Sequence, residues 1–274
     1  MEISRSNVFE IINRSSLNPD KDYGQNFLLE PKICNDIVSY LDINKDDSVL
    51  EIGPGLGSLT HFLSSCSNSI DVIDIDERMT NFLKVIYQEN SNVHIICSDI
   101  RKVDVSKYNK IIGNLPYNIT SELIIYLLIN AKNVKKMVLM SQLEAYERIS
   151  ATSGKDYGPL SILIHLLGDI KKLLVVKPGS FYPQPKCNSL VFSFTSLDGV
   201  DKNEVIEIYK LSKSLFLNRR KTILNNLTNL IKDKDRAKKI LNDCQIMENK
   251  RPEEIIIQDY VKLYSIMKKL ENNL

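Results

Sequence analysis

The chain has 274 residues, of which 43% are hydrophobic and 26% charged, a composition typical of a soluble globular protein. This length allows one substantial domain and a smaller second one. Residues 200–274 contain 16 Lys and Arg against 11 Asp and Glu, a net of +5, whereas the preceding 199 residues have a net of −3. A basic C-terminal segment favours a polyanionic partner, although Lys-rich helices are more often only solvated.

The cysteines, histidines and apolar runs exclude several classes of protein. Five cysteines are scattered without a C-x-x-C pair, and the three histidines have no metal-ligand spacing. We therefore expect free thiols in a reducing compartment and no metal. No apolar run is long enough to cross a bilayer, and no signal-peptide segment opens the sequence, so we expect a cytoplasmic protein.

In chain order, residues 1–22 are polar and irregular and predict a flexible arm. An apolar stripe at helical spacing then predicts a helix from Pro31 to Leu41, with the proline near its start. Strands and helices alternate from residue 48 to residue 150. Strands are expected at 48–53, 69–76, 93–99, 110–113 and 136–141, and helices after the glycines of the first turn and near 77–88, 121–129 and 143–150. This alternation predicts an α/β domain whose parallel sheet has helices on both faces.

The pattern changes towards the C-terminus. The segments 173–179 and 189–194 flank a Pro-rich loop and predict a late hairpin added to the sheet. Beyond about residue 198 only amphipathic helices are expected. We therefore predict an α/β domain at 1–198 and a helical domain at 199–274.

The sequence EIGPGLG, residues 51–57, directly follows the first predicted strand of the sheet. Glycines such as Gly53 and Gly55 let a backbone approach a ligand at the N-terminus of the next helix. The spacing is G-x-G-x-G, whereas the dinucleotide fingerprint is G-x-G-x-x-G, which disfavours a nicotinamide oxidoreductase. The loop alone is weak support for a ligand site, because a tight turn without any ligand can have the same Gly-rich sequence.

Two carboxylates follow the next two strands. Asp74 is expected to accept hydrogen bonds from ribose hydroxyls and Asp99 from an adenine amino group, since both lie at the ligand-binding edge of a parallel sheet. The alternative for each is a helix N-cap or turn, which is our interpretation of Asp76. A loop without a phosphate-binding Lys, followed by two carboxylates, suits S-adenosylmethionine as the cofactor.

The sequence GNLPYNIT, residues 113–120, places an amide, a proline and a phenol at the end of a strand. The exocyclic amine of adenine is a poor nucleophile because its lone pair is delocalised into the ring. The side-chain oxygen of Asn114 and the backbone carbonyl of Leu115 would favour rehybridisation of that nitrogen by accepting its two N–H groups. Pro116 stiffens the turn, and Tyr117 offers a face for stacking. The alternative is a strand-ending turn in which Tyr117 packs on the sheet.

These motifs together resemble the rRNA adenine N6,N6-dimethyltransferases, the kasugamycin-sensitivity enzymes of bacteria and their eukaryotic and archaeal relatives. The resemblance runs from about Tyr23 to Ile266. It is carried by six segments in order: YGQNFL, EIGPGLG, GNLPYNIT, YGPLSIL, FYPQPKCNS and NRRKTILNNL. It implies a Rossmann-like class I methyltransferase sheet followed by a small all-helical domain.

The resemblance also implies roles for single residues. Cofactor contacts are implied for Asn26, Leu28, Gly53, Asp74, Asp99 and Asn114, and catalysis for Asn114, Leu115 and Tyr117. Phe181 resembles a second aromatic residue that sandwiches the flipped base, with a hairpin-core role as the alternative. At position 74 the family usually has Glu, so the shorter Asp puts bidentate contact with the ribose in doubt.

An adenine inside a helix cannot reach such a pocket, so the target must be single-stranded, looped or flipped out. Arg219, Arg220 and Lys221, predicted to open a helix, are candidate phosphate contacts, and Lys155 is a further candidate; the alternative is a solvated charge run. We expect a monomer that dimethylates two adjacent adenosines in a 3′-terminal hairpin loop of 16S rRNA, acting on an immature small ribosomal subunit. The alternatives are a large-subunit methylase of the macrolide-resistance type and a non-catalytic assembly factor.

Overall fold

The structure, a computed structural model, describes residues 2–20 and 22–272, which form two compact units. Unit 1 contains the described residues up to Tyr146 together with Asp169–Ser196. Unit 2 contains Glu147–Gly168 and the described residues from Leu197 onwards. The chain therefore enters the helical unit twice. This differs from the predicted division into 1–198 and 199–274, which put Glu147–Gly168 in the first domain.

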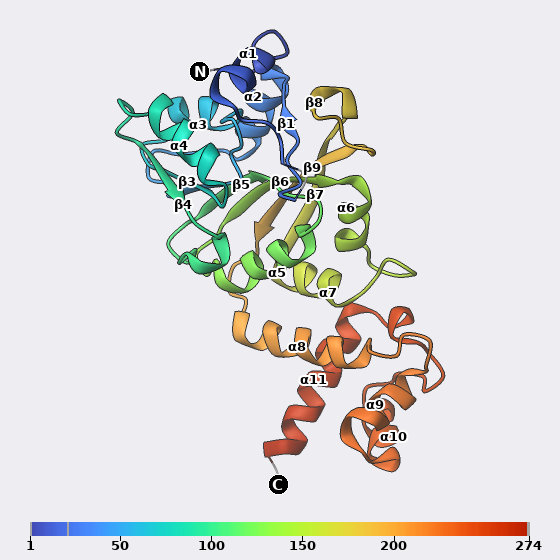
Figure 1. Cartoon of the computed structure of the whole chain (residues 1–274). Coiled ribbons are helices and arrows are strands. Elements are labelled where there is room, and N and C mark those ends of the chain that lie inside the picture. The colour runs from blue at the N-terminus through green and yellow to red at the C-terminus, as the bar shows by residue number, and fades with distance from the viewer. Residues whose placement is uncertain (1, 21, 273–274) are drawn as a thin grey trace. The chain divides into compact units, whose positions relative to one another are not determined.

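Unit 1 is built on a seven-stranded sheet with the strand order β4-β3-β2-β5-β6-β9-β7 (Figure 1). The strands are β2 Val49–Ile52, β3 Ile70–Asp74, β4 Val93–Cys97, β5 Lys110–Asn114, β6 Lys136–Gln142, β7 Gly168–Val176 and β9 Ser189–Ser196. The strands from β4 to β6 pair in parallel, and β9 is antiparallel to β6. The predicted α/β fold with a Rossmann-like sheet is confirmed, and the late strands β7 and β9 are neighbours in it.

Helices cover both faces of this sheet, with α2, α3 and α4 on one side and α5 on the other (Figure 1). The helices of unit 1 are α2 Pro31–Tyr40, α3 Thr60–Cys66, α4 Glu77–Ile86, α5 Thr120–Asn130 and the start of α6 Leu143–Ser150, with short 3-10 turns at Ile100–Lys102 and Pro178–Ser180. Because the inner strands are covered on both faces, they are continuous apolar runs. All four residues of β2 are buried, Glu51 among them.

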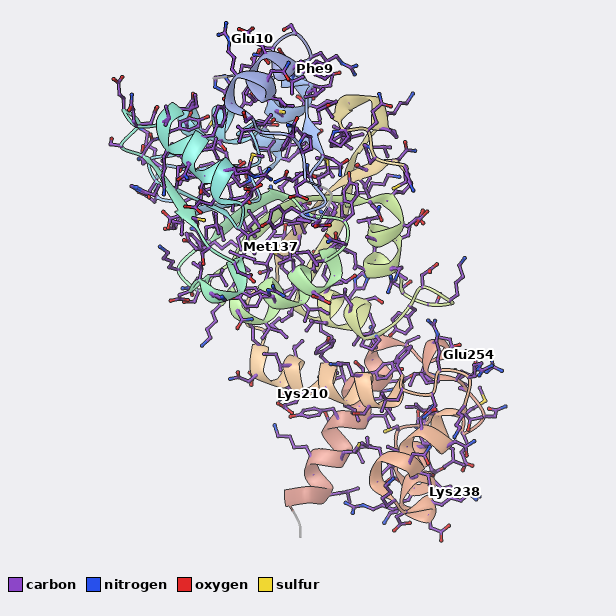
Figure 2. All side chains as sticks on the ribbon, viewed as in Figure 1. Phe9, Glu10, Met137, Lys210, Lys238 and Glu254 are labelled. Atoms are coloured by element: carbon purple, nitrogen blue, oxygen red, sulfur yellow. The ribbon has the colours of Figure 1, made fainter. Side chains whose placement is uncertain are left out.

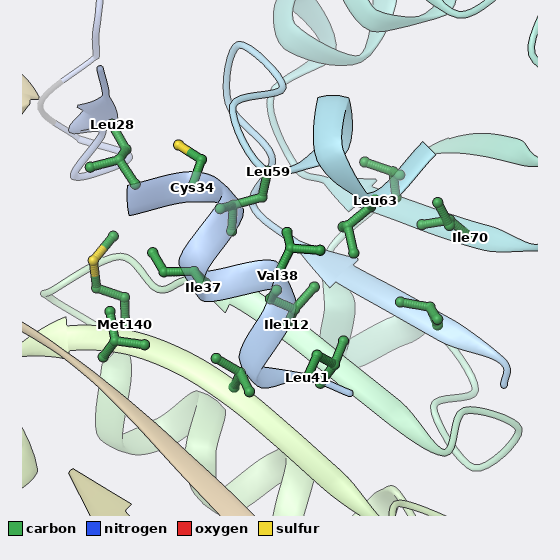
Figure 3. Packing of buried hydrophobic residues seen from close by; sticks show 14 of the residues in the cluster. Leu28, Cys34, Ile37, Val38, Leu41, Leu59, Leu63, Ile70, Ile112 and Met140 are labelled. Atoms are coloured by element: carbon green, nitrogen blue, oxygen red, sulfur yellow. The ribbon is translucent and has the colours of Figure 1, made fainter. Parts of the chain in front are cut away.

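The core of unit 1 lies between α2 and the sheet. Figure 3 shows Ile37 and Val38 of α2, and Leu41 at its C-cap, facing Ile112 and Met140 of the sheet. These side chains are nearly inaccessible to solvent. Full burial of such a side chain stabilises a fold by about 1.5–3 kcal/mol. The core therefore fixes the strands whose ends carry the predicted motifs.

The N-terminal segment differs from the prediction of a flexible arm over residues 1–22, of which residues 1 and 21 lie outside the described part. It contains helix α1, Val8–Ser15, on which Phe9 and Glu10 are exposed (Figure 2). A second apolar cluster buries residues of this segment together with residues of unit 1: Ile3, Val8, Ile12, Leu17, Phe27, Leu29, Leu56 and Met79. Val8 and Ile12 lie on one face of α1, and Ile3 and Leu17 on either side of the helix pack into the same cluster, so this part of the segment is folded.

The chain then continues into a two-stranded antiparallel ribbon that joins distant motifs. It consists of β1, Phe27–Leu28, and β8, Phe181–Tyr182. The ribbon brings the YGQNFL and FYPQPKCNS segments side by side. Residues 22–28 are thereby held close to the glycine loop, where the Leu28 carbonyl accepts a hydrogen bond from Ser58 Oγ at 2.8 Å.

Unit 2 is helical. It contains α7 Pro159–Leu167, α8 Lys202–Leu215, α9 Ile223–Ile231, α10 Lys234–Asp243 and α11 Ile257–Asn272, with a 3-10 turn at Pro252–Glu254. Tyr157 and Ile162 are fully buried in the same apolar cluster as Ile208 and Leu215 of α8, which explains why Glu147–Gly168 belongs here. Within residues 2–20 and 22–272, no helix is both long and apolar enough to cross a membrane.

Candidate cofactor and acceptor site

A cavity opens at the carboxyl ends of β2, β3 and β5, the edge at which open α/β sheets bind ligands. The predicted site residues that line this cavity are Asn26, Leu28, Gly53, Gly55, Asp74, Asn114, Leu115, Pro116 and Tyr117. These residues come from four separate segments of the sequence. The structure therefore brings the YGQNFL segment, the glycine loop, the second strand end and the NLPY turn to one place.

The glycine loop has the conformation that its sequence predicts. Gly53 and Gly55 have φ values of +64° and +55°, in the left-handed region that side chains disfavour. A Cβ atom on Gly55 would lie 3.0 Å from the Phe27 ring, tighter than most real Cβ contacts. Glycine at these positions therefore keeps the loop close to both β1 and the end of β5.

Asp74, the last residue of β3, is held with its carboxylate towards the glycine loop. It accepts a hydrogen bond from the Asp76 N–H at 2.9 Å and, more weakly, from the Gly55 N–H at 3.4 Å. Burial raises its pKa to about 6. Two residues later, Asp76 accepts from the Arg78 N–H and caps α4, as the sequence predicted. The two acidic residues thus have different roles, one in the cavity and one at a helix end.

Glu51 also lines the cavity and was missed by the sequence analysis. Its side chain is 1% exposed, and burial raises its pKa to about 8. One carboxyl oxygen accepts a hydrogen bond from Thr60 Oγ1 at 2.7 Å, and the other, Oε1, has no partner. The available signal was an acidic residue inside an otherwise apolar strand, immediately before the glycine loop. A buried polar atom without a partner in a cavity wall is a position for a ligand donor.

Asn114 ends β5 with its amide group oriented by the N-terminal segment. Its Nδ2 donates to the backbone carbonyl of Asn26 at 3.0 Å, while its Oδ1 is buried and has no partner. The next N–H, that of Leu115, donates to the Met140 carbonyl at 3.0 Å and fixes the turn to β6. The NLPY turn therefore presents one fixed acceptor atom, Asn114 Oδ1, that has no hydrogen-bond partner within the protein.

Residues 22–26 form one wall of the cavity. Gln25 Nε2 donates to Asp76 Oδ2 at 2.9 Å. A Cβ atom at Gly24 would lie 3.3 Å from Asn118 Oδ1 and 3.7 Å from Pro116 Cβ. This wall thus depends both on the cap of α4 and on the NLPY turn. The sequence analysis identified Asn26 in this segment, and Leu28 just after it, but overlooked Gln25.

Tyr117 lies beyond the turn with its ring half-buried and its hydroxyl hydrogen bonded to Ser189 Oγ. Burial raises the pKa of the phenol, so it is neutral at physiological pH. A neutral, half-exposed ring at this point of the cavity offers a stacking face and no base. This placement favours the predicted stacking role over simple packing on the sheet.

Two predicted residues are not brought to the cavity lining. Asp99 lies two residues beyond β4, where its carboxylate caps the turn Ile100–Lys102 and pairs with Arg101 at 2.6 Å. Phe181 is 2% exposed and packs in the core of unit 1. These contacts match the turn-forming role given as the alternative for Asp99 and the hairpin-core role given for Phe181, and contact of either residue with a ligand stays a prediction. Asp99 is kept out of the cavity lining by its ion pair with the neighbouring Arg101. Phe181 is held in the core because it is part of the β1–β8 ribbon.

The charge of the cavity distinguishes among ligands. Within the part of the chain that the structure describes, its lining includes the acids Asp22, Glu51 and Asp74 and no Lys, Arg or His. Glu51, with its pKa raised to about 8, holds a proton near pH 7, so the negative charge comes from the two aspartates. Such a surface attracts a cation and repels a polyphosphate. The donors and acceptors present fit S-adenosylmethionine, which has a sulfonium, an ammonium and a ribose diol but no phosphate. Among the described parts of the chain, no group of three or more His, Cys, Asp or Glu is placed to hold a metal.

The predicted RNA-contacting residues lie in unit 2. Arg219, Arg220 and Lys221 occupy the turn between α8 and α9, before the N-cap Thr222, and do not open the helix itself. Arg219 is bound inside the unit: its Nη2 donates to the Gly154 carbonyl at 2.8 Å, and its Nε lies 3.6 Å from Glu253 Oε2. The exposed residues Arg220 and Lys221 extend from the same turn.

The contact between Arg219 and Gly154 also places Lys155 beside this turn. A further backbone bond, from Ile223 N–H to the Lys250 carbonyl at 2.6 Å, brings residues 248–251 to the start of α9. Lys250 and Arg251 were not identified from the sequence, because only the fold brings them to the turn. The basic turn cluster is defined here as Lys155, Arg220, Lys221, Lys250 and Arg251.

Comparisons with known proteins agree with this geometry. Residues 16–269 match the family described as ribosomal RNA adenine dimethylase. The chain is 38% identical over 258 residues to ribosomal RNA small subunit methyltransferase A of Mycoplasma mycoides, covering 90% of this chain and 97% of that one. It is 35% identical to the protein of the same name in Macrococcus caseolyticus, covering 95% and 94%.

Solved structures give the same result for the fold. The dimethyladenosine transferase of Plasmodium falciparum matches with a TM-score of 0.78 and 29% identity, covering 89% of this chain and 98% of that one. The 23S rRNA methyltransferase ErmE matches with a TM-score of 0.69 and 18% identity, covering 88% and 99%, which is a likeness of fold alone.

Proposed function

The chain belongs to the ribosomal RNA adenine dimethylase family, and we propose that it dimethylates N6 of two adjacent adenosines in a 3′-terminal hairpin loop of 16S rRNA. It is an S-adenosylmethionine-dependent rRNA adenine N6,N6-dimethyltransferase. The observation that carries the proposal is Asn114, whose Oδ1 is buried in the cavity wall without a partner. An amine donor arriving in the cavity would satisfy it.

The residues divide into a donor side and an acceptor side. When bound, S-adenosylmethionine supplies a methyl group activated by a sulfonium, so the transfer needs no metal. Asp74 accepts from the ribose hydroxyls, and Glu51 offers Oε1 to a donor at the base of the cavity. Gly53 and Gly55 keep the loop clear of side chains. Together these groups bind and orient the methyl donor at the end of the sheet.

The acceptor side holds the target nitrogen. Asn114 Oδ1 and the Leu115 carbonyl accept the two N–H groups of the adenine amine and favour the geometry in which its lone pair leaves the ring plane. Tyr117 stacks on the base and fixes its distance from the donor. No strong base is needed, because the amine becomes acidic as it is methylated. Catalysis is thus positioning together with preorganised dipoles.

The small subunit is favoured over the large subunit as the source of the target. The curated relatives at 35–38% identity are named small subunit methyltransferases, whereas the likeness to ErmE is 18%. The turn also has the sequence NLPYN, and we expect large-subunit resistance enzymes to read more like N-I-P-Y-H. A non-catalytic assembly factor would have no need of the unpartnered Asn114 Oδ1.

Unit 2 supplies the RNA contacts in this proposal. The basic turn cluster presents charges from three segments that backbone and side-chain hydrogen bonds hold together. Such charges bind phosphates and position the RNA without reading its sequence. We propose that the protein acts as a monomer in the cytoplasm on an immature small subunit, in which the target loop is exposed.

Transfer of labelled methyl groups to unmethylated small subunits, followed by fragment mapping of the RNA, tests the proposal. We expect four methyl groups per RNA, about two on each of two adjacent adenosines near the 3′ end. Purified large subunits should remain unlabelled. Label in the large subunits, or single methyl groups scattered over the small-subunit RNA, would contradict the assignment.

A further inference from the structure

Tyr117 and Ser189 are far apart in the sequence and meet on the acceptor side of the cavity. Their hydroxyl groups are hydrogen bonded to each other at 2.5 Å. Tyr117 follows the turn after β5, whereas Ser189 is the first residue of β9, two strands along the sheet. Ser189 is fully buried. The bond therefore joins the aromatic ring of the acceptor side to the interior of the sheet.

The backbone around Ser189 is held on both sides. Ser189 pairs with Gln142 of β6, and the carbonyl of the preceding Asn188 accepts from the Leu143 N–H at 3.1 Å. The backbone just before Tyr117 is also attached to β6, because the Leu115 N–H donates a hydrogen bond to the carbonyl of Met140 in that strand. The Tyr117 ring is thus fixed at its backbone through β6 and at its hydroxyl through β9.

We infer that Ser189 is a positioning residue, which holds the Tyr117 ring in the orientation that stacks on the target base; this inference rests on the function proposed above. A tyrosine ring with a free hydroxyl end can tilt about χ1 and rotate about χ2, whose energy profile is broad. A tilted ring misplaces a stacked base, and a misplacement of about 1 Å can slow an enzyme considerably. The phenol hydroxyl thus acts through ring geometry, with no part in proton transfer.

The inference makes the phenol and the serine one functional unit. Ser189→Ala and Tyr117→Phe should each slow methyl transfer at saturating RNA by about 3- to 10-fold, the range expected for one hydrogen bond. The double variant should be no slower than either single variant, because both remove the same bond. The affinities for RNA and cofactor should stay unchanged. Ser189→Thr, which keeps the hydroxyl, should restore most of the rate.

Ser193→Ala is the matched control. Ser193 is a buried serine on the same face of β9, four residues further along, and pairs with Val138. Replacing Ser193 by Ala removes a serine hydroxyl from the same strand, but at a position that does not bond to Tyr117. We expect its rate to equal that of the unchanged protein, with thermal unfolding showing that both alanine variants are folded.

Nuclear magnetic resonance of the protein with a ¹³C-labelled Tyr117 ring provides a readout that does not depend on methylation. The ring should show one ordered environment in the unchanged protein and in Ser193→Ala, and averaged signals in Ser189→Ala. Identical ring signals in all three would overturn the inference, as would single-variant effects that multiply in the double variant. If the unchanged protein methylates no adenine, the proposed function fails, while the ring signals still decide the role of Ser189.

Discussion

Asn114 and Asn26 are joined by a hydrogen bond from Nδ2 of the first to the backbone carbonyl of the second, at 3.0 Å. This bond settles which end of the amide faces the ligand. Because Nδ2 is used by the N-terminal segment, Oδ1 remains the free atom, and it is an acceptor. In the proposed mechanism, the segment before β1 therefore orients a catalytic amide that belongs to another motif.

Replacement of Asp74 by Ala should weaken the binding of S-adenosylmethionine by about 1–3 kcal/mol, the cost of leaving the ligand's hydroxyl groups without a charged acceptor. Calorimetry measures this directly. Asp104→Ala, the loss of an exposed acid in unit 1, should leave the affinity unchanged. Asp74→Glu, which introduces the longer side chain that the resemblance implies at this position, tests whether the shorter Asp limits contact with the ribose. Tight binding of NAD with no response to S-adenosylmethionine would contradict the assignment of the cavity.

The stability of the protein should fall as the pH rises through neutrality because of Glu51. Burial raises its pKa from an ordinary 4.5 to about 8. Between these values the folded state holds a proton that the unfolded chain has released, so the stabilisation is complete below pH 4.5 and is lost as the pH passes 8. The total change is on the order of a few kcal/mol.

Urea unfolding at about pH 6.5 and pH 8.5 isolates this effect. Asp74, with a pKa raised to about 6, changes stability with the same sign, but mostly below that window. Glu51→Gln should flatten the pH dependence, whereas Glu89→Gln, at an exposed position, should retain it. A dependence that survives in Glu51→Gln would show that another group titrates.

The three basic residues of NRRK should differ in their roles. Arg220→Ala combined with Lys221→Ala should weaken RNA binding and flatten its salt dependence by roughly one unit of log–log slope per lost phosphate contact, without loss of stability. Arg219→Ala should instead lower the free energy of unfolding by about 1 kcal/mol, because its bonds to Gly154 and Glu253 hold the turn.

The control for this experiment is Lys238→Ala combined with Lys239→Ala. These residues are exposed on α10, where Figure 2 shows Lys238, and their loss changes the net charge of unit 2 equally. RNA affinity and its salt slope should then stay close to those of the unchanged protein. Equal slopes for both double variants would mean that the basic turn cluster does not contact phosphates.

The N-terminal helix should contribute to stability. Ile12 is 2% exposed in the cluster with Phe27 and Met79, so Ile12→Ala should cost about 2–4 kcal/mol of unfolding free energy. Asn13→Ala, at the exposed next position, should have little effect. Chemical denaturation compares the two. No loss of stability in Ile12→Ala would restore the interpretation of this segment as a flexible arm.

The sheet could be predicted from the sequence because its strands are apolar runs bounded by turns. Segments such as 48–53 and 110–113 correspond to β2 and β5, and Asp74, at the end of another predicted strand, pointed to the edge where the cavity lies. The NLPY turn was also identifiable, since an amide, a proline and a phenol after a buried strand have few structural explanations. In each case the signal lay within a few neighbouring residues.

The remaining features depend on contacts that sequence patterns do not contain. Tyr157 and Ile162 precede strands β7 and β9 yet pack with α8, so no local signal placed them in the helical unit. Asp99 is paired with Arg101, and Phe181 is buried by the β1–β8 ribbon. A motif names the residues that can bind a ligand, but packing decides which of them face it.

The most direct test of the account is methyl transfer to unmethylated small subunits by the unchanged protein and by Asn114→Ala, with analysis of the product nucleosides. The unchanged protein should yield N6,N6-dimethyladenosine. The variant should lose most of its turnover, by about 100-fold or more, because its missing oxygen acts as the nitrogen rehybridises, while RNA binding stays within about twofold. Near-normal turnover by Asn114→Ala at saturating RNA and cofactor would contradict the catalytic role of this residue, and with it the proposed mechanism.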